Sequence, residues 1–368
     1  MTDKRCQLIS ELEGALHRLP RVPLANLPTP LQPCPRLSSA LGGPAIWFKR
    51  DDLTGLALSG NKSRMFEYLF GAAKAEGIDA FVAGAGVQSN YCRQLAAACA
   101  RLGIECHLVL RRVRGHEDDK IQGGLLLDLL FGAGVEIIDG GWEELRTAIA
   151  MKARDLRAAG KRVWVAGVGD ETNMALHTCG YVQAALEMAR QSEQMGVALN
   201  EVWLCSTDMT QAGLALGFKH LRIPARVVGV PALPKPIAPG RTFPEIIAQT
   251  ANECAELLGL STRLSPAEVV SLDGYAGSEY GAVTSSALEA LHLLARCEAI
   301  LLDPVYTAKA FSALIGYIRQ GRFHRDSPVV FVHTGGFPAV FAYADALVPD
   351  FTTSAGSSSL KASAPLRR

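Results

Sequence analysis

Residues 58–70, LSGNKSRMFEYLF, place a lysine directly after Ser-Gly-Asn and at the start of an amphipathic helical pattern. Glycine lets a chain turn sharply before a helix begins. Lys62 is therefore either an ordinary solvated charge or an amine that this turn delivers to a reaction. The segments on both sides of it help to distinguish these two interpretations.

Short β-rich runs alternate with helical patterns along the whole chain. Nine runs are predicted as strands, at residues 45–50, 79–84, 105–111, 135–139, 162–167, 201–206, 225–230, 299–303 and 328–334. Helices are predicted at residues 64–76, 89–102, 143–159, 177–191, 210–220, 244–258, 284–297 and 306–319. This alternation predicts an α/β fold with parallel sheets covered by helices on both faces. Because nine strands are many for one sheet, we expect two doubly wound domains with a ligand site between them.

A balanced charge and an ordinary composition exclude several classes of protein. The 37 Lys and Arg residues against 36 Asp and Glu give no attraction to nucleic acid or to a membrane surface. No apolar segment has the length of a membrane span, and the first residues do not resemble a signal peptide, so we expect a cytoplasmic protein. The cysteines form no CxxC pair and the histidines show no ligand spacing, so no metal site is expected. Residues 351–368, rich in Ser, Gly and Ala, are expected to form a disordered tail.

Polar residues gather where several predicted strands end. They are Gln88, Ser89 and Asn90 in GAGVQSNY, Ser206, Thr207 and Thr210 in CSTDMTQAG, Tyr306 and Thr307 in LLDPVYTAK, and the glycines 335 and 336 in VHTGGFPAV. Taken alone, Ser89 and Asn90 are equally well explained as helix caps. A helix amino terminus with such neighbours is also a site for a carboxylate. Because the carboxyl ends of parallel strands meet at one sheet edge, these turns and Lys62 are predicted to form one site.

Several of these segments resemble the 1-aminocyclopropane-1-carboxylate (ACC) deaminase and D-cysteine desulfhydrase family, pyridoxal-phosphate enzymes with the tryptophan synthase β-like fold. The likeness runs in order from about residue 20 to about residue 348, through KRDDLTGLALSGNKSR, GAGVQSNYCRQLAAACARLG, DGYAGSEYG, AILLDPVYTAK and VVFVHTGGFPAVFAY. It implies a large domain from residues 1–65 and 173–350, and a small inserted domain at residues 66–172. It also implies pyridoxal phosphate in the cleft, a small amino acid as substrate and a homodimer.

The same resemblance assigns roles to individual residues. Lys62, in the family's GNK motif, would form the internal aldimine with the cofactor. Tyr280 in SEYG and Tyr306 in DPVY match two active-site tyrosines that move protons or orient the amino acid. Ser89 would lie near the substrate α-carbon, and with Gln88 and Asn90 it would bind the substrate carboxylate and the pyridine hydroxyl. The full cofactor-binding set implied is Lys62, Asn90, Ser206, Thr207, Thr210, Thr307, Thr334 and Gly335.

Two positions favour one branch of that family. Thr307 would meet the pyridine nitrogen, and a hydroxyl there leaves the nitrogen largely unprotonated and weakens the electron sink. The deaminase branch has Glu at that position, and it has Leu where this chain has Thr334. Both choices favour a desulfhydrase-like β-elimination.

Two departures from the family pattern concern the cofactor phosphate. Family members carry a lysine three residues after the Schiff-base lysine, and this chain has Met65 there. They also carry a glycine-rich phosphate loop, whereas residues 205–210, CSTDMT, contain no glycine and add Asp208. A phosphate cup needs N–H groups that point at the dianion, and a neighbouring carboxylate repels it. Both changes place phosphate binding in doubt.

Three functions therefore stay open at the level of sequence. The first is a pyridoxal-phosphate dependent lyase or deaminase that acts on a small amino acid through Lys62. The second is an enzyme on the same scaffold, in specialised metabolism, that no longer uses the cofactor in the usual way. The third is a noncatalytic protein that binds amino acids in the same cleft.

Overall fold

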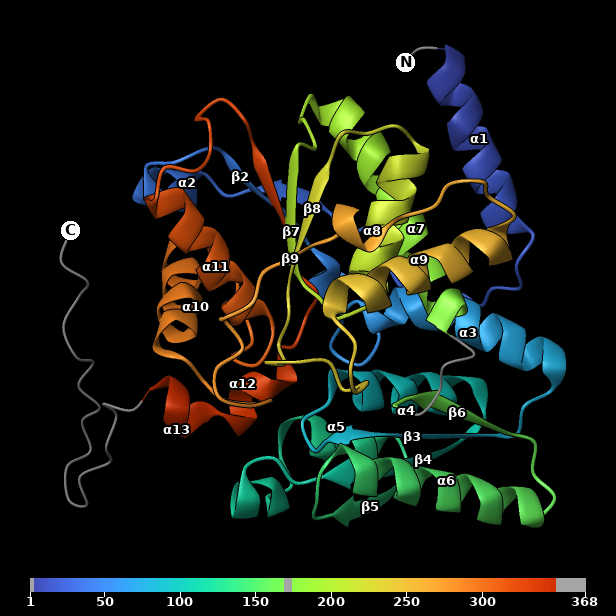
Figure 1. The fold of residues 1–368 in the computed structure, drawn as a ribbon. Coiled ribbons are helices and arrows are strands. Elements are labelled where there is room, and N and C mark those ends of the chain that lie inside the picture. The colour runs from blue at the N-terminus through green and yellow to red at the C-terminus, as the bar shows by residue number, and fades with distance from the viewer. Residues whose placement is uncertain (1–2, 169–173, 349–368) are drawn as a thin grey trace, which may run out of the picture.

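The computed structural model describes residues 3–168 and 174–348, in which helices alternate with strands around two sheets (Figure 1). The larger sheet has the strand order β1-β2-β10-β7-β8-β9 and the smaller one β5-β4-β3-β6. Strands of the larger sheet are β1 (Leu31–Pro33), β2 (Ile46–Lys49), β7 (Glu201–Cys205), β8 (Arg226–Val230), β9 (Val270–Ser271) and β10 (Val329–Val332). Those of the smaller sheet are β3 (Ala80–Gly86), β4 (Glu105–Arg111), β5 (Gly134–Ile138) and β6 (Val163–Gly167). All neighbouring strands are parallel except β1, which pairs antiparallel with β2.

Helices cover both faces of the larger sheet. Successive residues of a strand point to opposite faces, so each strand contributes side chains to two separate cores. On one face, Val202 and Leu204 of β7 belong to a core with α1 (Asp3–His17), α3 (Lys62–Glu76), α7 (Met174–Met195), α8 (Met209–His220) and α9 (Phe243–Leu258). On the other face, Trp203 packs in a core with α2 (Pro35–Leu41), α10 (Ser285–Glu298) and α11 (Thr307–Arg319). The two-sheet α/β fold predicted from the sequence is thus confirmed.

The smaller sheet is buried in the same way. Phe81 of β3 lies in a core with α3 and α4 (Asn90–Leu102), while Ala80 and Val82 pack against α6 (Trp142–Ala158). Figure 1 shows α3 between the two sheets. This helix contributes Tyr68 to a core of the larger sheet and Phe70 to a core of the smaller one. Helix α3, which begins at Lys62, therefore packs with both sheets.

The strands of the smaller sheet all fall within residues 66–172, the segment expected to form an inserted domain. The exact domain limits stay a prediction, because the boundary at 172–173 lies outside the described residues. The tail expected at residues 351–368 lies outside them as well.

The predicted strand at residues 299–303 is wrong. Ala299 ends α10 in the left-handed region with φ 55°, and the residues that follow form no strand. The carbonyl of Leu301 accepts a hydrogen bond from His333 at 2.9 Å, and the N–H of Asp303 donates to Thr307 Oγ1 at 2.8 Å. Because side chains use these backbone groups, no ladder forms here. The sequence patterns also missed the short strands β1 and β9 and the helices α1, α2 and α5 (Gly123–Leu130).

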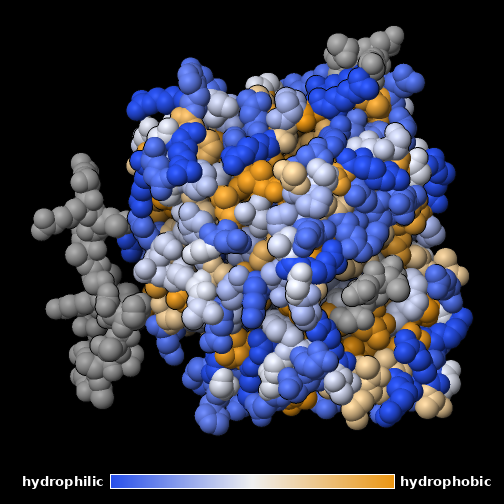
Figure 2. Space-filling view, viewed as in Figure 1, coloured by the Kyte–Doolittle hydropathy of each residue, from blue (hydrophilic) through white to orange (hydrophobic). Residues whose placement is uncertain are grey.

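The surface shown in Figure 2 is predominantly hydrophilic, with hydrophobic residues in smaller separate areas. No helix in residues 3–168 or 174–348 combines the length and apolar character needed to cross a membrane. Across the same two ranges, no group of three or more His, Cys, Asp or Glu side chains is arranged to hold a metal ion.

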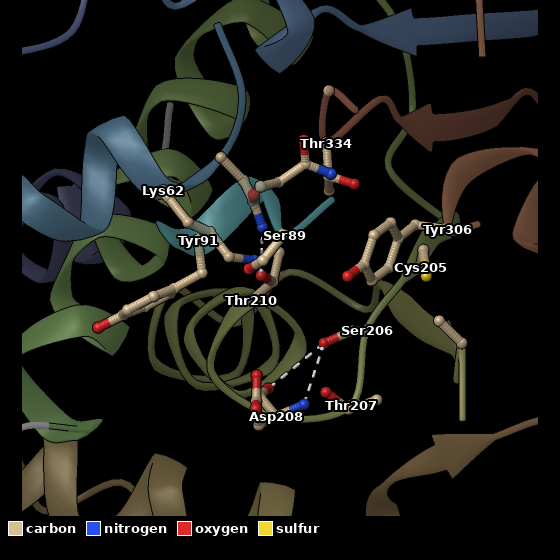
Figure 3. Close-up of a pocket in the computed structure, with 14 residues that line it drawn as sticks. Lys62, Ser89, Tyr91, Cys205, Ser206, Thr207, Asp208, Thr210, Tyr306 and Thr334 are labelled. Atoms are coloured by element: carbon tan, nitrogen blue, oxygen red, sulfur yellow. Dashed lines mark hydrogen bonds between the residues drawn. The ribbon is translucent and has the colours of Figure 1, made fainter. Parts of the chain in front are cut away.

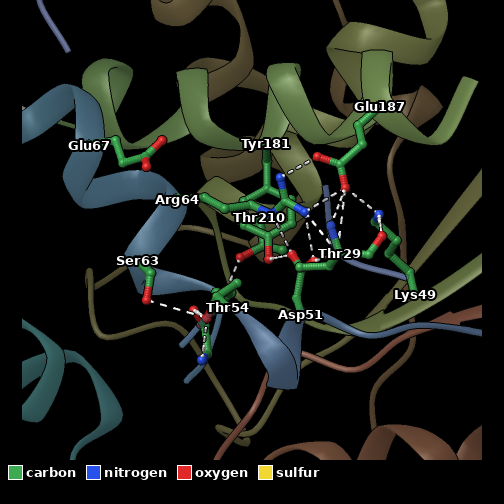
Figure 4. A network of polar contacts seen from close by, with 12 residues as sticks. Thr29, Lys49, Asp51, Thr54, Ser63, Arg64, Glu67, Tyr181, Glu187 and Thr210 are labelled. Carbon is green, nitrogen blue, oxygen red and sulfur yellow. Dashed lines mark hydrogen bonds and ion pairs between the residues drawn. The ribbon is translucent and has the colours of Figure 1, made fainter. Parts of the chain in front are cut away.

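A buried ionic network fixes the first turn of α3 (Figure 4). The fully buried guanidinium of Arg64 pairs with Asp51 at 2.9 Å and with Glu187 of α7 at 2.9 Å. Lys49 of β2 also pairs with Glu187, and the hydroxyl of Tyr181 donates to Asp51 at 2.6 Å. Because buried charges are tolerated only when paired, this network holds β2, α3 and α7 in one relative position.

We expect the substitution Asp51→Asn to lower the free energy of unfolding by about 3–5 kcal/mol, because it leaves Arg64 buried without full compensation. Urea unfolding followed by circular dichroism measures this loss. Lys219→Gln, which breaks an exposed ion pair with Glu268, is the control and should cost less than about 1 kcal/mol. Equal effects of the two substitutions would contradict the role given to the network.

The same pair predicts a pH dependence of stability. Burial opposes ionisation of Asp51, but Arg64 outweighs it and lowers the pKa of that carboxyl to about 2, from 3.8 in an unfolded chain. A lowered pKa means that the ionised group stabilises the fold above pH 3.8, and that this contribution is lost as the pH falls toward 2. The stability difference between the wild type and Asp51→Asn should therefore be constant from neutral pH to about 4 and shrink below it. A difference that grows in acid would contradict this sign.

Candidate active site

A cavity of about 90 Å³ lies where α3, α4 and α8 begin, beside the carboxyl ends of β7 and β10. It is lined by Asn61, Lys62, Ser89, Asn90, Tyr91, Cys205, Ser206, Thr207, Asp208, Thr210, Ala232, Tyr306, Thr334 and Gly335. Figure 3 shows Lys62 on one side of it, Tyr306 on the opposite side and Asp208 at its lower edge. A second cavity of about 290 Å³, with mainly apolar walls, shares these three residues and extends to Tyr280 and Trp142.

The turn before Lys62 has an unusual backbone. Ala57, Leu58 and Ser59 have φ values of 50°, 60° and 70°, and Gly60 follows with φ 132°. Side chains disfavour this left-handed region by about 1–2 kcal/mol per residue. Such strain persists only where the surrounding structure holds the turn, and it is typical of functional sites.

Arg93 of α4 holds this turn from the side of the smaller sheet. Its buried guanidinium donates to the carbonyl oxygen of Ala57 and, at 3.1 Å, to that of Ser59. It also donates to Asn90 Oδ1 at 3.0 Å. One side chain therefore sets both the strained turn and the orientation of an amide that lines the cavity.

The turn is equally constrained from the side of the larger sheet. The hydroxyl of Thr54 accepts from the N–H of Gly60 and donates to its carbonyl oxygen, both at 2.8 Å. The N–H of Asn61 donates to the carbonyl oxygen of Thr334 at 3.0 Å. A Cβ at Gly335 would lie only 2.6 Å from the Gly60 Cα, so glycine is needed for this close approach.

Lys62 is partly exposed and lines both cavities. Its amine has no hydrogen bond or ion pair with any residue that the structure describes. Burial lowers the pKa of Lys62 below its usual value of 10.5, and the negative charge of Asp208 offsets this only in part. A larger share of the amine is therefore unprotonated and able to attack an aldehyde than on an exposed lysine. The interpretation of Lys62 as an ordinary surface charge does not fit this environment.

The start of α4 serves two purposes. Ser89 is its N-cap, because its Oγ accepts from the N–H of Cys92 at 3.3 Å, and both Ser89 and Asn90 also line the smaller cavity. Gln88 behaves differently, since its Oε1 accepts from the N–H of Gly124 at 2.7 Å. Gln88 therefore fastens the first turn of α5, and it lines neither of the two cavities.

The start of α8 carries the hydroxyls expected at a phosphate. Ser206 Oγ accepts from the N–H of Gln211 at 3.1 Å, and Thr210 Oγ1 accepts from the amide of Asn61 at 3.0 Å. The N-cap is Asp208, whose Oδ1 accepts from the N–H of Met209 at 2.7 Å. Most of these polar groups thus already have partners within the protein.

Two phenols face each other at the wall opposite Lys62. The hydroxyls of Tyr280 and Tyr306 are hydrogen-bonded to one another, and both line the larger cavity. Burial raises the pKa of Tyr306 well above 10 and also raises that of Tyr280. Both groups therefore stay protonated near neutral pH, so they are proton donors rather than bases.

Most of the residues predicted from the sequence come together. The smaller cavity collects Lys62, Ser89, Asn90, Ser206, Thr207, Thr210, Tyr306, Thr334 and Gly335. Thr307 does not line either cavity, because its Oγ1 donates to the buried carboxylate of Asp303 at 2.7 Å. Its predicted contact with the cofactor stays a prediction, and so does the predicted contact of Gln88 with the substrate.

Sequence reasoning missed four residues of the smaller cavity, namely Asn61, Tyr91, Cys205 and Ala232. Asn61 and Tyr91 directly flank residues that were selected, so adjacency to the GNK and QSN motifs was an available signal. Cys205 is the last residue of β7, where parallel strands present ligand-binding groups. Burial raises the pKa of its thiol to about 12, so it is a neutral wall of the cavity.

The cavity fits pyridoxal phosphate in most respects. The amine of Lys62, which has no partner among the described residues, suits the cofactor's aldehyde, and Asn90 and Tyr306 contribute further polar groups to the same cavity. The hydroxyls of Ser206, Thr207 and Thr210 at the amino end of α8 suit its phosphate. The exception is the carboxylate of Asp208 in the same loop.

Known proteins resemble this chain over most of its length. The family described as pyridoxal-phosphate dependent enzymes matches residues 22–335. An ACC deaminase of Burkholderia vietnamiensis is 39% identical over 337 residues, which is 90% of this chain and 98% of that protein. A D-cysteine desulfhydrase of Salmonella newport is 39% identical over 331 residues, 89% of this chain and 97% of that protein.

Solved structures agree with this assignment. The crystal structure of an ACC deaminase homologue superposes with a TM-score of 0.82 at 32% identity, covering 92% of this chain and 98% of that one. A threonine deaminase from T.th. has a TM-score of 0.60 at 19% identity, covers 89% of this chain and 97% of that one, and supports the fold alone. The family resemblance and the fold predicted from the sequence are confirmed.

We expect Arg93→Lys to slow the coupling of Lys62 to pyridoxal phosphate by more than about tenfold, because misplacing reacting groups by about 1 Å costs on the order of a hundredfold. A lysine keeps the charge but cannot span two carbonyl oxygens and Asn90. Stopped-flow absorbance measures the rate. Arg101→Lys, at an exposed position of the same helix, is the control and should change nothing. A folded Arg93→Lys variant with the wild-type rate would refute the positioning role.

Proposed function

The chain belongs to the pyridoxal-phosphate dependent enzymes, and on this basis we propose that it is a lyase or deaminase that acts on a small amino acid through Lys62. The observation that carries this proposal is the amine of Lys62, which has no partner among the described residues and which a strained turn holds in a cavity with Ser89, Asn90 and Tyr306. The curated relatives named above are a deaminase and a desulfhydrase, and both match nearly the whole chain.

Distinct parts of the cavity would hold cofactor and substrate. Ser206, Thr207 and Thr210 would bind the phosphate, and Thr334 and Gly335 would lie against the ring from the end of β10. Ser89 and Asn90, at the amino end of α4, would bind the substrate carboxylate, since exposed helix N–H groups favour an anion. When bound, pyridoxal phosphate withdraws electrons from the α-carbon of the amino acid and so makes its proton acidic.

We assign proton transfer to Lys62, Tyr280 and Tyr306, side chains of the two cavities that can exchange a proton. Lys62, with its lowered pKa, can accept a proton there and return it. Tyr306 lines both cavities and is protonated, and Tyr280 is hydrogen-bonded to it. These phenols would therefore donate a proton to a leaving group, or a hydrogen bond to a substrate carboxylate.

We propose β-elimination of the D-cysteine desulfhydrase type rather than opening of the ACC ring. Identity does not separate these possibilities, since both curated relatives are 39% identical. Thr334, one of the two residues that favoured elimination, lines the smaller cavity, whereas the hydroxyl of Thr307 is bonded to Asp303. The choice therefore rests mainly on Thr334.

We also propose a cytoplasmic homodimer. All nine cysteines are free, which suits a reducing compartment. Helix α5 packs beside α12 (Pro338–Ala342), and together they expose large apolar side chains, with Leu130 at 69% and Phe341 at 60% exposure. Neighbouring exposed apolar side chains of this kind are typical of protein interfaces.

The absorbance spectrum of the purified protein with added pyridoxal phosphate tests the proposed function. We expect a visible band that is absent in Lys62→Ala and present in the control Lys74→Ala, which removes an exposed lysine from the same helix. Turnover without cofactor would favour a diverged enzyme, and ligand-induced thermal stabilisation without turnover would favour a binding protein.

The substrate assay separates the two branches. The wild type should release sulfide from D-cysteine faster than it releases ammonia from ACC. Faster release of ammonia from ACC would overturn the proposed elimination, while leaving the cofactor assignment intact.

A further inference from the structure

The amino end of α8 already carries an anion of the chain's own. Asp208 is the N-cap, and its carboxylate accepts a hydrogen bond from the N–H of Met209 at 2.7 Å. Anions are favoured at this end of a helix by the exposed N–H groups and the helix dipole. A carboxylate of the protein therefore occupies part of the environment that a cofactor phosphate would use.

The other polar groups of this loop are also largely committed. Ser206 Oγ accepts from the N–H groups of Gln211 and Asp208, at 3.1 and 3.4 Å. Thr210 Oγ1 accepts from the amide of Asn61 at 3.0 Å. The hydroxyl of Thr207 is the one in this loop that has no hydrogen-bond partner among residues 3–168 and 174–348.

Within the described residues, Lys62 is the one cation that shares the smaller cavity with this carboxylate. Among the described residues that line the smaller cavity, the charged side chains are Lys62 and Asp208 alone. Met65, three residues after Lys62, is fully buried in an apolar core with Tyr68 and Cys179. The positive charge of Lys62 is not available for the phosphate either, because its amine is the group that the cofactor aldehyde takes.

From this geometry we infer that Asp208 weakens the hold on the cofactor phosphate, so that the site discriminates poorly between pyridoxal phosphate and unphosphorylated pyridoxal. The inference rests on the proposed function, because it assumes that Lys62 binds this aldehyde. The phosphate brings a charge of about −1.5 to −2, and like charges a few ångströms apart repel even at an effective dielectric of about 20. Pyridoxal carries no such charge and is not repelled.

The test compares both aldehydes in three proteins by equilibrium titration of the visible band. Asp208→Asn removes the charge with little change of shape, and Asp208→Glu retains it as a control. We expect Asp208→Asn to lower the dissociation constant of pyridoxal phosphate by about tenfold or more, and to change that of pyridoxal by less than about twofold. Free pyridoxal cyclises to the same extent whichever of the three proteins is titrated, so this equilibrium does not affect the comparison of dissociation constants.

The outcomes separate the two claims. If both aldehydes bind but Asp208→Asn leaves the ratio of their dissociation constants unchanged, the role of Asp208 is refuted and the proposed function stands. If neither aldehyde gives a band in any of the three proteins, the proposed function fails, and the inference that depends on it fails as well. The ratio in Asp208→Glu should stay within about threefold of the wild type, because the repulsion depends on charge. A tenfold shift there would assign the effect to shape instead.

Discussion

The guanidinium of Arg64 is the point on which the rest of the site depends. It lies in the first turn of α3, two residues after Lys62, and it pairs with carboxylates that follow β2 and that belong to α7. A charge buried in this way is stable only with its partners in place, so the network has essentially one arrangement. The direction in which α3 begins, and with it the position of the Lys62 backbone, is fixed by the core of the larger sheet.

This anchoring explains how the strained turn before Lys62 is tolerated. Three residues in the left-handed region would make an isolated loop rearrange. Here α3 is held at one end, and Arg93 and Thr54 bond to the turn itself. Because Arg93 comes from the smaller sheet and Thr54 from the segment after β2, the amine sits where both layers constrain it.

The sequence predicted those features that depend on local pattern. Alternating apolar and helical segments identified the parallel sheets, and polar residues at strand ends identified the cavity around Lys62, because parallel strands end at one edge. Prediction from the sequence was wrong where a contact with a side chain elsewhere in the chain determines the local structure. Residues 299–303 resemble a strand, yet His333 and Thr307 take their backbone groups. The contact of Thr307 with the cofactor, expected from its position in a motif, stays a prediction, and in this structure its hydroxyl donates to Asp303.

The amine and the phosphate cup are physically separable parts of this site. The amine is placed by buried pairs and close backbone contacts, and the carboxylate of Asp208 takes part in none of the hydrogen bonds that hold the turn. The proposed phosphate-binding loop, residues 205–210, is short, and its affinity for an anion depends on a few N–H groups and on the charges near them. A carboxylate such as Asp208 can therefore cap α8 and alter the binding of an anion, while Lys62 keeps its geometry and its lowered pKa. Under the proposed function, such a site would retain covalent binding of an aldehyde while its affinity for the phosphate changes.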